Sequence, residues 1–253
     1  MTTITLELDL LNPGQFFACC GLLELADRLW PGTEGWFNDA TLALRLPDQA
    51  STGQPLVEIL EALLHADLQV PPVEDGSKED AVAPLQLGAP FFLHLDHWRA
   101  AYTFSKTWAG NQKSASIAED MRTALRSFGA NTITARLLGE ARPMTGRFGY
   151  DARSGWNALD VGYSPNAQDE AVRTYPAVEL LAAIGLQGFR PRATDGTLKY
   201  HAWPRPLPVP VARAACPGAL PIQGSRSFWF RISARGNYRT FGFASQEDEP
   251  WNP

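Results

Sequence analysis

Apolar and polar positions alternate at the start of the chain. From Thr3 to Leu10 every second residue is apolar, which is the period of a strand with one buried face. Asn12 and Pro13 come next, and these residue types suit the N-cap and the first position of a helix. We expect that helix from about Gln15 to Leu29, so the pattern predicts an N-terminal strand–helix unit.

Helical and strand periods recur further along the chain. One or two strands are expected over 35–46, strand-like sequence returns over 85–98, and an amphipathic helix is expected over 55–68. Another helix is expected over 114–128, where Ser116 and Glu119 have the spacing of a capping box. On that helix Arg122 and Arg126 are four residues apart, which predicts that both lie on its outer face.

The second half of the chain predicts three further features. Residues 139–174 show little periodicity and are expected to form an extended loop region, whereas the helix near 176–189 is apolar almost all round and should be buried. From 227 to 244 the pattern predicts a C-terminal β-hairpin, with Phe228 and Phe230 on one face and Trp229 and Arg231 on the other. Without a sustained βαβ rhythm, the expected fold class is mixed α+β.

Composition describes an ordinary globular protein. The chain has 253 residues, 45% hydrophobic and 19% charged, and no apolar run reaches the length of a membrane span. The first residues lack a basic leader and an apolar signal core, which predicts a cytoplasmic location. Three cysteines, two of them adjacent, do not form an even framework for disulfide bonds.

Charge is divided unevenly along the chain, although the net charge is only −5. Residues 1–100 hold 4 Lys and Arg against 15 Asp and Glu, whereas residues 101–240 hold 18 against 9. This predicts an acidic α+β region, 1–100, that faces other subunits, and a basic region, 101–253, that faces nucleic acid. The alternative is one continuous domain whose two halves neutralise each other across an internal interface.

Sequence signatures of catalysis are missing. No G-x-S-x-G elbow occurs, and Lys113-Ser114 lacks the glycine spacing of a phosphate-binding loop. His65 and His201 are isolated in the sequence, and His94 and His97 should point to opposite faces of a strand. The chain is therefore expected to be a binding protein that is not an enzyme and holds no metal or cofactor.

Three features of the basic half suit nucleic acid. The loop 110–113 precedes a helix, where backbone N–H groups attract anions and amide side chains can read base edges. The second feature is a series of arginines with aromatic neighbours: Arg136, Arg142, Arg147 and Arg153, with Phe148, Tyr150 and Trp156. The third is the arginine-bearing hairpin, which could enter a groove. The alternatives are an ordinary polar loop, a structural network with Asp151 and Asp160, and a solvated hairpin face.

These features define a candidate nucleic-acid-binding set. Its members are Asn111, Gln112, Lys113, Arg122, Arg126, Arg147, Arg153, Arg235, Asn237 and Arg239. We expect the positive charge between residues 101 and 240 to converge in space into one surface that grips a sugar-phosphate backbone. Binding of this kind weakens steeply as the salt concentration rises.

Four segments carry a family resemblance. LNPGQFFACCGLLELADRLW, RFGYDARSGWNALDVGYSPN, YPAVELLAAIGLQGFRP and PLPVPVARAACPGAL resemble the large-subunit family of type I-G (formerly I-U) CRISPR–Cas systems, over most of the chain. Large subunits in related systems are often bigger, which is the departure from the pattern. The resemblance implies a subunit of an RNA-guided surveillance complex (Cascade) in antiviral defence.

The resemblance also implies partners and roles. Such a subunit contacts guide RNA, target double-stranded DNA and other CRISPR-associated subunits, reads the short motif beside the target, and helps recruit a helicase–nuclease. On this basis the loop 110–113 is the first candidate for motif reading, and Arg235 with Asn237 is the second. Two other functions remain open: a protein-only scaffold, and an RNA-processing nuclease that uses His201 or His97.

Overall fold

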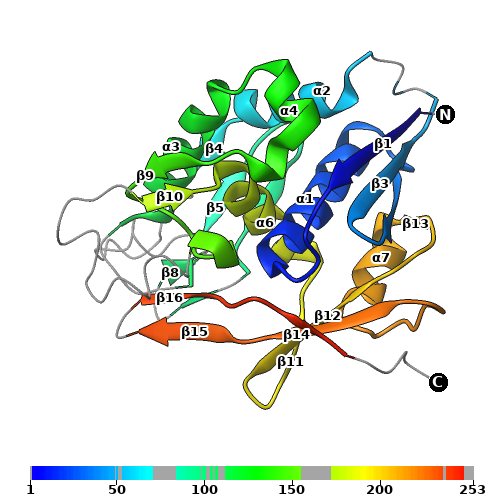
Figure 1. Cartoon of the computed structure of the whole chain (residues 1–253). Coiled ribbons are helices and arrows are strands. Elements are labelled where there is room, and N and C mark those ends of the chain that lie inside the picture. Colours follow the sequence, from blue (N-terminus) through cyan, green and yellow to red (C-terminus); the bar gives the residue numbers. More distant parts are fainter. Residues whose placement is uncertain are drawn as a thin grey trace.

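The fold is a mixed α+β arrangement around two crossing helices (Figure 1). The computed structural model describes residues 2–48, 50, 53–70, 84–97, 99–100, 103–104, 106–107, 112–154, 172–235 and 238–247. The central helices are α1 (Pro13–Leu29) and α6 (Pro176–Gly188). The others are α2 (Pro55–His65), α3 (Ser114–Arg126), α4 (Ala130–Arg136), the 3-10 turn η2 (Leu137–Gly139) and α7 (Val209–Ala215).

The two central helices touch backbone to backbone. A Cβ on Gly21 would lie 2.1 Å from the carbonyl oxygen of Leu181, and one on Gly185 would lie 2.0 Å from that of Phe17. Only glycine fits at either position, and the helices can therefore approach closely enough to bury α6 on all sides, as predicted. The Asn12 cap is also confirmed, since its Oδ1 accepts from the backbone N–H of Gly14 at 3.1 Å.

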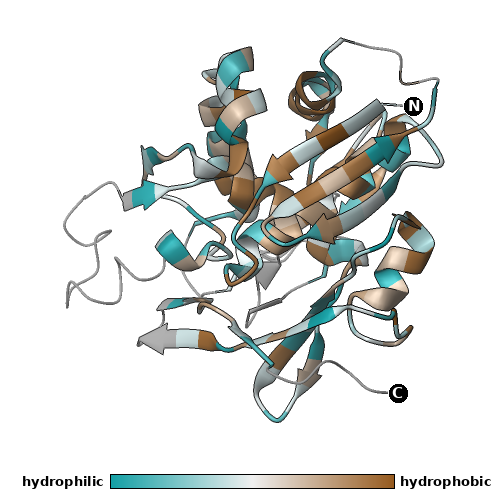
Figure 2. Cartoon of the chain, turned by 45° about the vertical axis from the view of Figure 1, so that its right-hand side comes forward, coloured by the Kyte–Doolittle hydropathy of each residue, from teal (hydrophilic) through white to brown (hydrophobic). Residues whose placement is uncertain are grey.

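Two four-stranded antiparallel sheets flank this pair of helices. The first has the order β1-β3-β2-β13: β1 (Thr2–Glu7), β3 (Thr41–Leu46), β2 (Glu34–Asn38) and β13 (Leu207–Pro208). The second has the order β11-β12-β14-β17: β11 (Arg192–Thr194), β12 (Thr197–Ala202), β14 (Arg226–Phe230) and β17 (Ser245–Gln246). Figure 2 shows the expected alternation of apolar and polar residues as brown and paler bands along β1 and β3.

Smaller sheets complete the described part of the chain. They are β4-β5-β6 (Leu68–Gln69, Leu85–Leu87, Leu93–Leu95), β7-β8 (Arg99–Ala100, Thr103–Phe104), β9-β10 (Arg142–Met144, Val172–Thr174) and β15-β16 (Ile232–Arg235, Tyr238–Phe241). The β9-β10 pair corrects the expectation of a continuous loop over 139–174. The C-terminal hairpin is confirmed as β15-β16, but β14 pairs with β12 and β17 and so lies outside it.

The acidic and basic halves share one hydrophobic core. The hydroxyl of Tyr200 donates to the carbonyl oxygen of Leu10 at 2.5 Å, and the indole N–H of Trp203 donates to that of Gly35 at 2.7 Å. Ion pairs also cross the boundary, joining Arg213 to Glu24 and Arg226 to Asp39. Residues of both halves therefore contribute to one core, and some of their charges pair across the boundary.

All three cysteines are buried as free thiols. They lie on α1 and directly after α7, as Cys19, Cys20 and Cys216. Burial raises the pKa of each thiol, and the charges of Cys19 and Cys216 raise the pKa of Cys20 further. Separately, none of the helices in the described ranges is both long and apolar enough to cross a membrane.

Candidate nucleic-acid interface

Three members of the predicted set lie wholly or partly outside the described part of the chain. These are Asn111, Asn237 and the side chain of Arg235, of which only the backbone is described, in β15. Their proposed part in motif reading stays a prediction.

Gln112 and Lys113 lead into α3. Lys113 is exposed and its extended backbone forms the N-cap position, without a side-chain hydrogen bond to the helix. The predicted capping box is therefore wrong: α3 begins at Ser114, so Ser116 already lies within its first turn. Gln112 is half-buried, and its carbonyl oxygen accepts from Nζ of Lys106 at 2.6 Å. Burial lowers the pKa of Lys106 to about 8.

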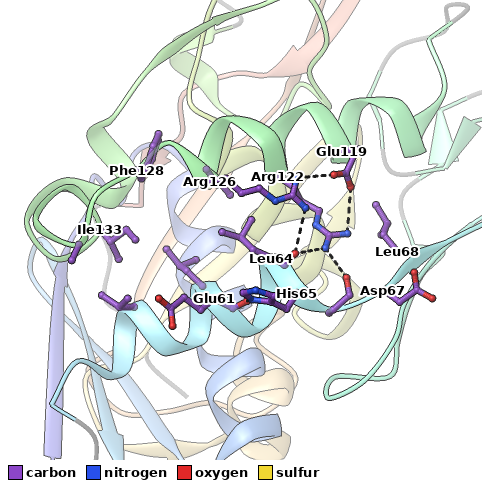
Figure 3. A pocket seen from close by; sticks show the side chains of 15 residues that line it. Glu61, Leu64, His65, Asp67, Leu68, Glu119, Arg122, Arg126, Phe128 and Ile133 are labelled. Carbon is purple, nitrogen blue, oxygen red and sulfur yellow. Dashed lines mark hydrogen bonds and ion pairs between the residues drawn. The ribbon is translucent and has the colours of Figure 1, made fainter.

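Arg122 does not lie on an outer face, which corrects the helical-wheel prediction. It is only 5% exposed, because α2 covers this side of α3, and its Nη2 donates to the carbonyl oxygens of Leu64 and Ala66 at 2.6 Å (Figure 3). These carbonyls end α2 and need donors from outside the helix. Arg126 is 47% exposed and pairs with Glu119 at 2.9 Å. Arg122 thus fastens α3 to α2, and Nη2 of Arg126 adds a longer hydrogen bond to the carbonyl oxygen of Leu64 at 3.4 Å.

A groove of about 660 Å³ lies between α2, α3 and α4 (Figure 3). Its floor is apolar and includes Leu64, Leu125, Phe128 and Ile133. Glu61, His65, Asp67 and Glu119 line it as well, and the two arginines are already engaged there. Negative charge at this groove makes it a poor place for a phosphate backbone.

Arg147 is also buried, at 1% exposure, which is the wrong position for a side chain predicted to contact nucleic acid. The chain around it wraps a carboxylate. Both oxygens of Glu179 accept hydrogen bonds, from the backbone N–H groups of Phe148, Gly149, Tyr150 and Asp151 at 2.8–3.3 Å. Burial raises the pKa of Glu179 to about 7, while these N–H groups act in the opposite direction.

Arg153 is held in the same buried network. Its Nη2 lies 2.6 Å from Oδ2 of Asp151, and its guanidinium carbon lies 3.4 Å from the ring centre of Tyr175. Asp151 in turn accepts from the side-chain amide of Asn12 at 2.9 Å. The alternative of a structural network with Asp151 is therefore favoured for Arg153. Asp160 lies outside the described residues.

This network joins three of the four segments that carry the family resemblance. Asn12 comes from the first, residues 148–153 from the second and Glu179 from the third. At these described positions the three segments therefore contribute to packing of the core.

Arg239 is exposed on β16, and its carbonyl oxygen accepts from the hydroxyl of Thr107 at 2.5 Å. Thr107 also bonds the carbonyl oxygen of Phe148, so β16 lies against the loop that wraps Glu179. Of the predicted set, Lys113, Arg126 and Arg239 thus have exposed side chains in the described part of the chain.

A cluster that the prediction did not assemble lies beside β9 and β10. Arg136 ends α4, Arg142 begins β9 and Arg173 lies in β10, and all three surround Glu140. Nε of Arg136 lies 3.6 Å from Oε2 of Glu140, and Nη1 of Arg142 bonds Oε1. The hydrogen bond from Arg142 is the main reason why the pKa of Glu140 is lowered, with Arg136 and Arg173 adding to the effect. We call this group the Glu140 hollow.

The Glu140 hollow has a volume of about 470 Å³ and carries surplus positive charge. One carboxylate faces three guanidinium groups, and Arg136 is 71% exposed while Arg173 is also exposed. Arg142 makes a cation–π contact with Phe128, in which its guanidinium carbon lies 4.8 Å from the ring centre. Among the described residues no ion pair engages Arg173, so an anion that enters the hollow breaks none of those ion pairs at this arginine.

The predicted single basic surface is wrong for the described residues. Many cations between residues 101 and 240 pair with acids of the chain itself, namely Arg122, Arg126, Arg136, Arg142, Arg153, Lys199, Arg213 and Arg226. Arg136 and Arg142 belonged to the arginine series noted in the sequence, but Arg173 and Glu140 were missed. Antiparallel pairing of β9 with β10 brings Arg173 to this place, and no local pattern announces that pairing.

Comparisons with family models, with curated proteins and with solved structures found no match. Within the described ranges no group of three or more His, Cys, Asp or Glu side chains could hold a metal ion. His97 is half-buried, and burial lowers its pKa to about 4, so its imidazole is neutral at pH 7.

Proposed function

We propose that the chain is a non-catalytic subunit of an RNA-guided CRISPR surveillance (Cascade) complex that binds target DNA and reads the motif beside the target. The family resemblance of the sequence supports the assembly. The Glu140 hollow, in which three arginines surround one carboxylate, is the single observation that supports the DNA contact. Guide RNA, other CRISPR-associated subunits and a recruited helicase–nuclease are the partners of this proposal.

The chemistry of the hollow suits a phosphate group. Guanidinium groups bind phosphate through paired hydrogen bonds, and Arg136 and Arg173 present theirs to solvent. A phosphate that enters would bring negative charge to a place where, among the described residues, one carboxylate faces three guanidinium groups. Motif reading is assigned in this proposal to the loop 110–113, where Lys113 is exposed, with Arg235 and Asn237 second.

Binding of labelled duplex DNA, measured by fluorescence anisotropy over a series of salt concentrations, tests the proposal. Arg136→Ala and Arg173→Ala should each weaken binding and reduce the slope of log K against log [salt] by about 0.9, the loss of one phosphate contact. Arg205→Ala is the matched control, because Arg205 is exposed, does not line the hollow and bonds Gln223 among the described residues. Equal slopes for all three variants and wild type would contradict DNA binding at the hollow.

A protein-only scaffold is the second candidate, and one observation favours it. The groove between α2, α3 and α4 combines an apolar floor with a charged rim, as surfaces that dock other proteins do. Duplexes with different flanking motifs separate the two functions. The scaffold predicts equal binding to every motif and no loss with Lys113→Ala, whereas the DNA-reading subunit predicts a preference that Lys113→Ala reduces.

A further inference from the structure

The sheet β11-β12-β14-β17 has one buried face and one outer face. Tyr200, Phe228 and Phe230 pack into the core, with the rings of Tyr200 and Phe228 stacked at 5.3 Å. Because side chains alternate along each strand, their neighbours in sequence point outward. The inner face is thus fully occupied, and the outer face is available.

Strand register aligns outward residues into rows. Arg192 lies opposite Lys199, Lys199 opposite Trp229, and Trp229 opposite Ser245. In the next row along the strands His201 lies opposite Ser227. Residues directly opposite each other share one face and lie within reach of a common ligand. The outer face therefore presents a tryptophan beside a lysine and an arginine.

A hollow of about 520 Å³ opens on this face, and we call it the outer-sheet hollow. It is lined by Arg192, Lys199, His201 and Arg231, with Asp195 and Glu247 as its acids. Lys199 pairs with Glu247, and this hydrogen bond lowers the pKa of that carboxyl. In the described part of the chain no ion pair engages Arg192 or Arg231, both of which are exposed.

Trp229 is half-exposed and makes no ring or cation contact with the other described residues. The other described tryptophans pack on the core or on another group. Trp203 is buried and stacks on Phe189, Trp36 lies 6.0 Å from the guanidinium carbon of Arg45, and Trp30 packs against the hydrophobic core. An outward tryptophan without a partner, flanked by cations, is a suitable platform for an unpaired base.

We infer that the outer face of this sheet binds single-stranded nucleic acid. A base stacks on Trp229, which lies opposite the lining residue Lys199, and Arg192 and Arg231, which both line the outer-sheet hollow, contact phosphates. Stacking needs no particular base, so the site is expected to tolerate sequence. The inference goes beyond duplex binding at the Glu140 hollow, which lies on other elements, β9 and β10 (Figure 1), and it holds whether or not that proposal is right.

Anisotropy with labelled oligothymidine and oligouridine of equal length tests this inference on the full chain. Trp229→Ala should weaken binding roughly 5-fold to 100-fold, whereas Trp229→Phe, which keeps an aromatic face, should retain most of it. Arg192→Ala and Arg231→Ala should each reduce the salt slope by about 0.7, the value for one contact to a single strand. The two oligonucleotides show whether DNA or RNA is preferred.

Matched controls separate this site from other causes. Phe92→Ala removes an aromatic ring that is 71% exposed elsewhere, and Arg205→Ala removes an exposed arginine, so both should bind as wild type. Thermal melting followed by circular dichroism checks that each variant is folded. Duplex binding should be unchanged in Trp229→Ala, which distinguishes failure here from failure at the Glu140 hollow.

Three results would overturn the inference. The first is that wild-type protein binds neither oligonucleotide even at about 50 mM salt. The second is that Trp229→Ala binds as tightly as wild type. If, in addition, Arg136→Ala abolishes single-strand binding, the strand binds at the Glu140 hollow instead. The third is that Trp229→Ala no longer binds a partner subunit and no oligonucleotide binds either variant or wild type. The outer face would then be a protein interface.

Discussion

Two carboxylates of this protein are surrounded in opposite ways. Glu179 is fully buried and accepts hydrogen bonds from four backbone N–H groups that the fold holds in place. Glu140 lies at the surface and is surrounded by three arginine side chains. A buried carboxylate must be satisfied for the fold to be stable, whereas exposed ion pairs contribute little to stability. Surplus arginine at the surface therefore indicates binding rather than folding.

The largest effect is expected from removal of the buried carboxylate, Glu179. Glu179→Ala leaves four backbone N–H groups without an acceptor in the core, so we expect a loss of on the order of 3 kcal/mol of unfolding free energy. Urea denaturation followed by tryptophan fluorescence measures the loss. Glu140→Ala is the surface control and should shift the midpoint little. Similar shifts for the two variants would show that burial does not distinguish these carboxylates.

A smaller effect depends on pH. Burial raises the pKa of Glu179 to about 7 from its ordinary 4.5, so the folded state binds more protons than the unfolded state between these values. The stability that Glu179 contributes should fall by on the order of 1 kcal/mol per pH unit as pH rises through this window. The difference in unfolding free energy between wild type and Glu179→Gln isolates this change from other titrating groups.

Glu140 should show the opposite sign. Its pKa is lowered by the hydrogen bond from Arg142, so its contribution to stability is present above its ordinary pKa of 4.5 and is lost as pH falls below that value. Unfolding free energies of wild type and Glu140→Gln, compared over this acidic range, measure this contribution.

For Glu179, a difference between wild type and Glu179→Gln that does not vary with pH would mean that the four N–H groups keep Glu179 ionised throughout.

The smallest effect is expected on DNA binding when the surface carboxylate, Glu140, is neutralised. Glu140→Gln removes the one carboxylate of the Glu140 hollow, so duplex DNA should bind roughly twofold to fivefold more tightly at low salt. Anisotropy measures this gain, and Glu61→Gln, which removes an exposed carboxylate of the other groove, is the control. Unchanged or weaker binding by Glu140→Gln alone would count against phosphate at this position.

Local sequence patterns predicted the elements well and the site poorly. The Asn12 cap, the buried helix α6 and the strands over 35–46 follow from residue types a few positions apart, and all are confirmed. Arg122 was misplaced because a helical wheel cannot show that α2 covers that side of α3. The Glu140 hollow could not be assembled either, since it depends on the pairing of β9 with β10.

The buried thiols have a practical use. Cys19, Cys20 and Cys216 are all within the core, and burial raises the pKa of each, so little reactive thiolate forms on the folded protein. A single cysteine introduced on the surface would therefore react alone with a maleimide dye or a photocrosslinker. Without removing any native cysteine, a probe can be placed beside either hollow, and its distance to a labelled nucleic acid can be followed directly.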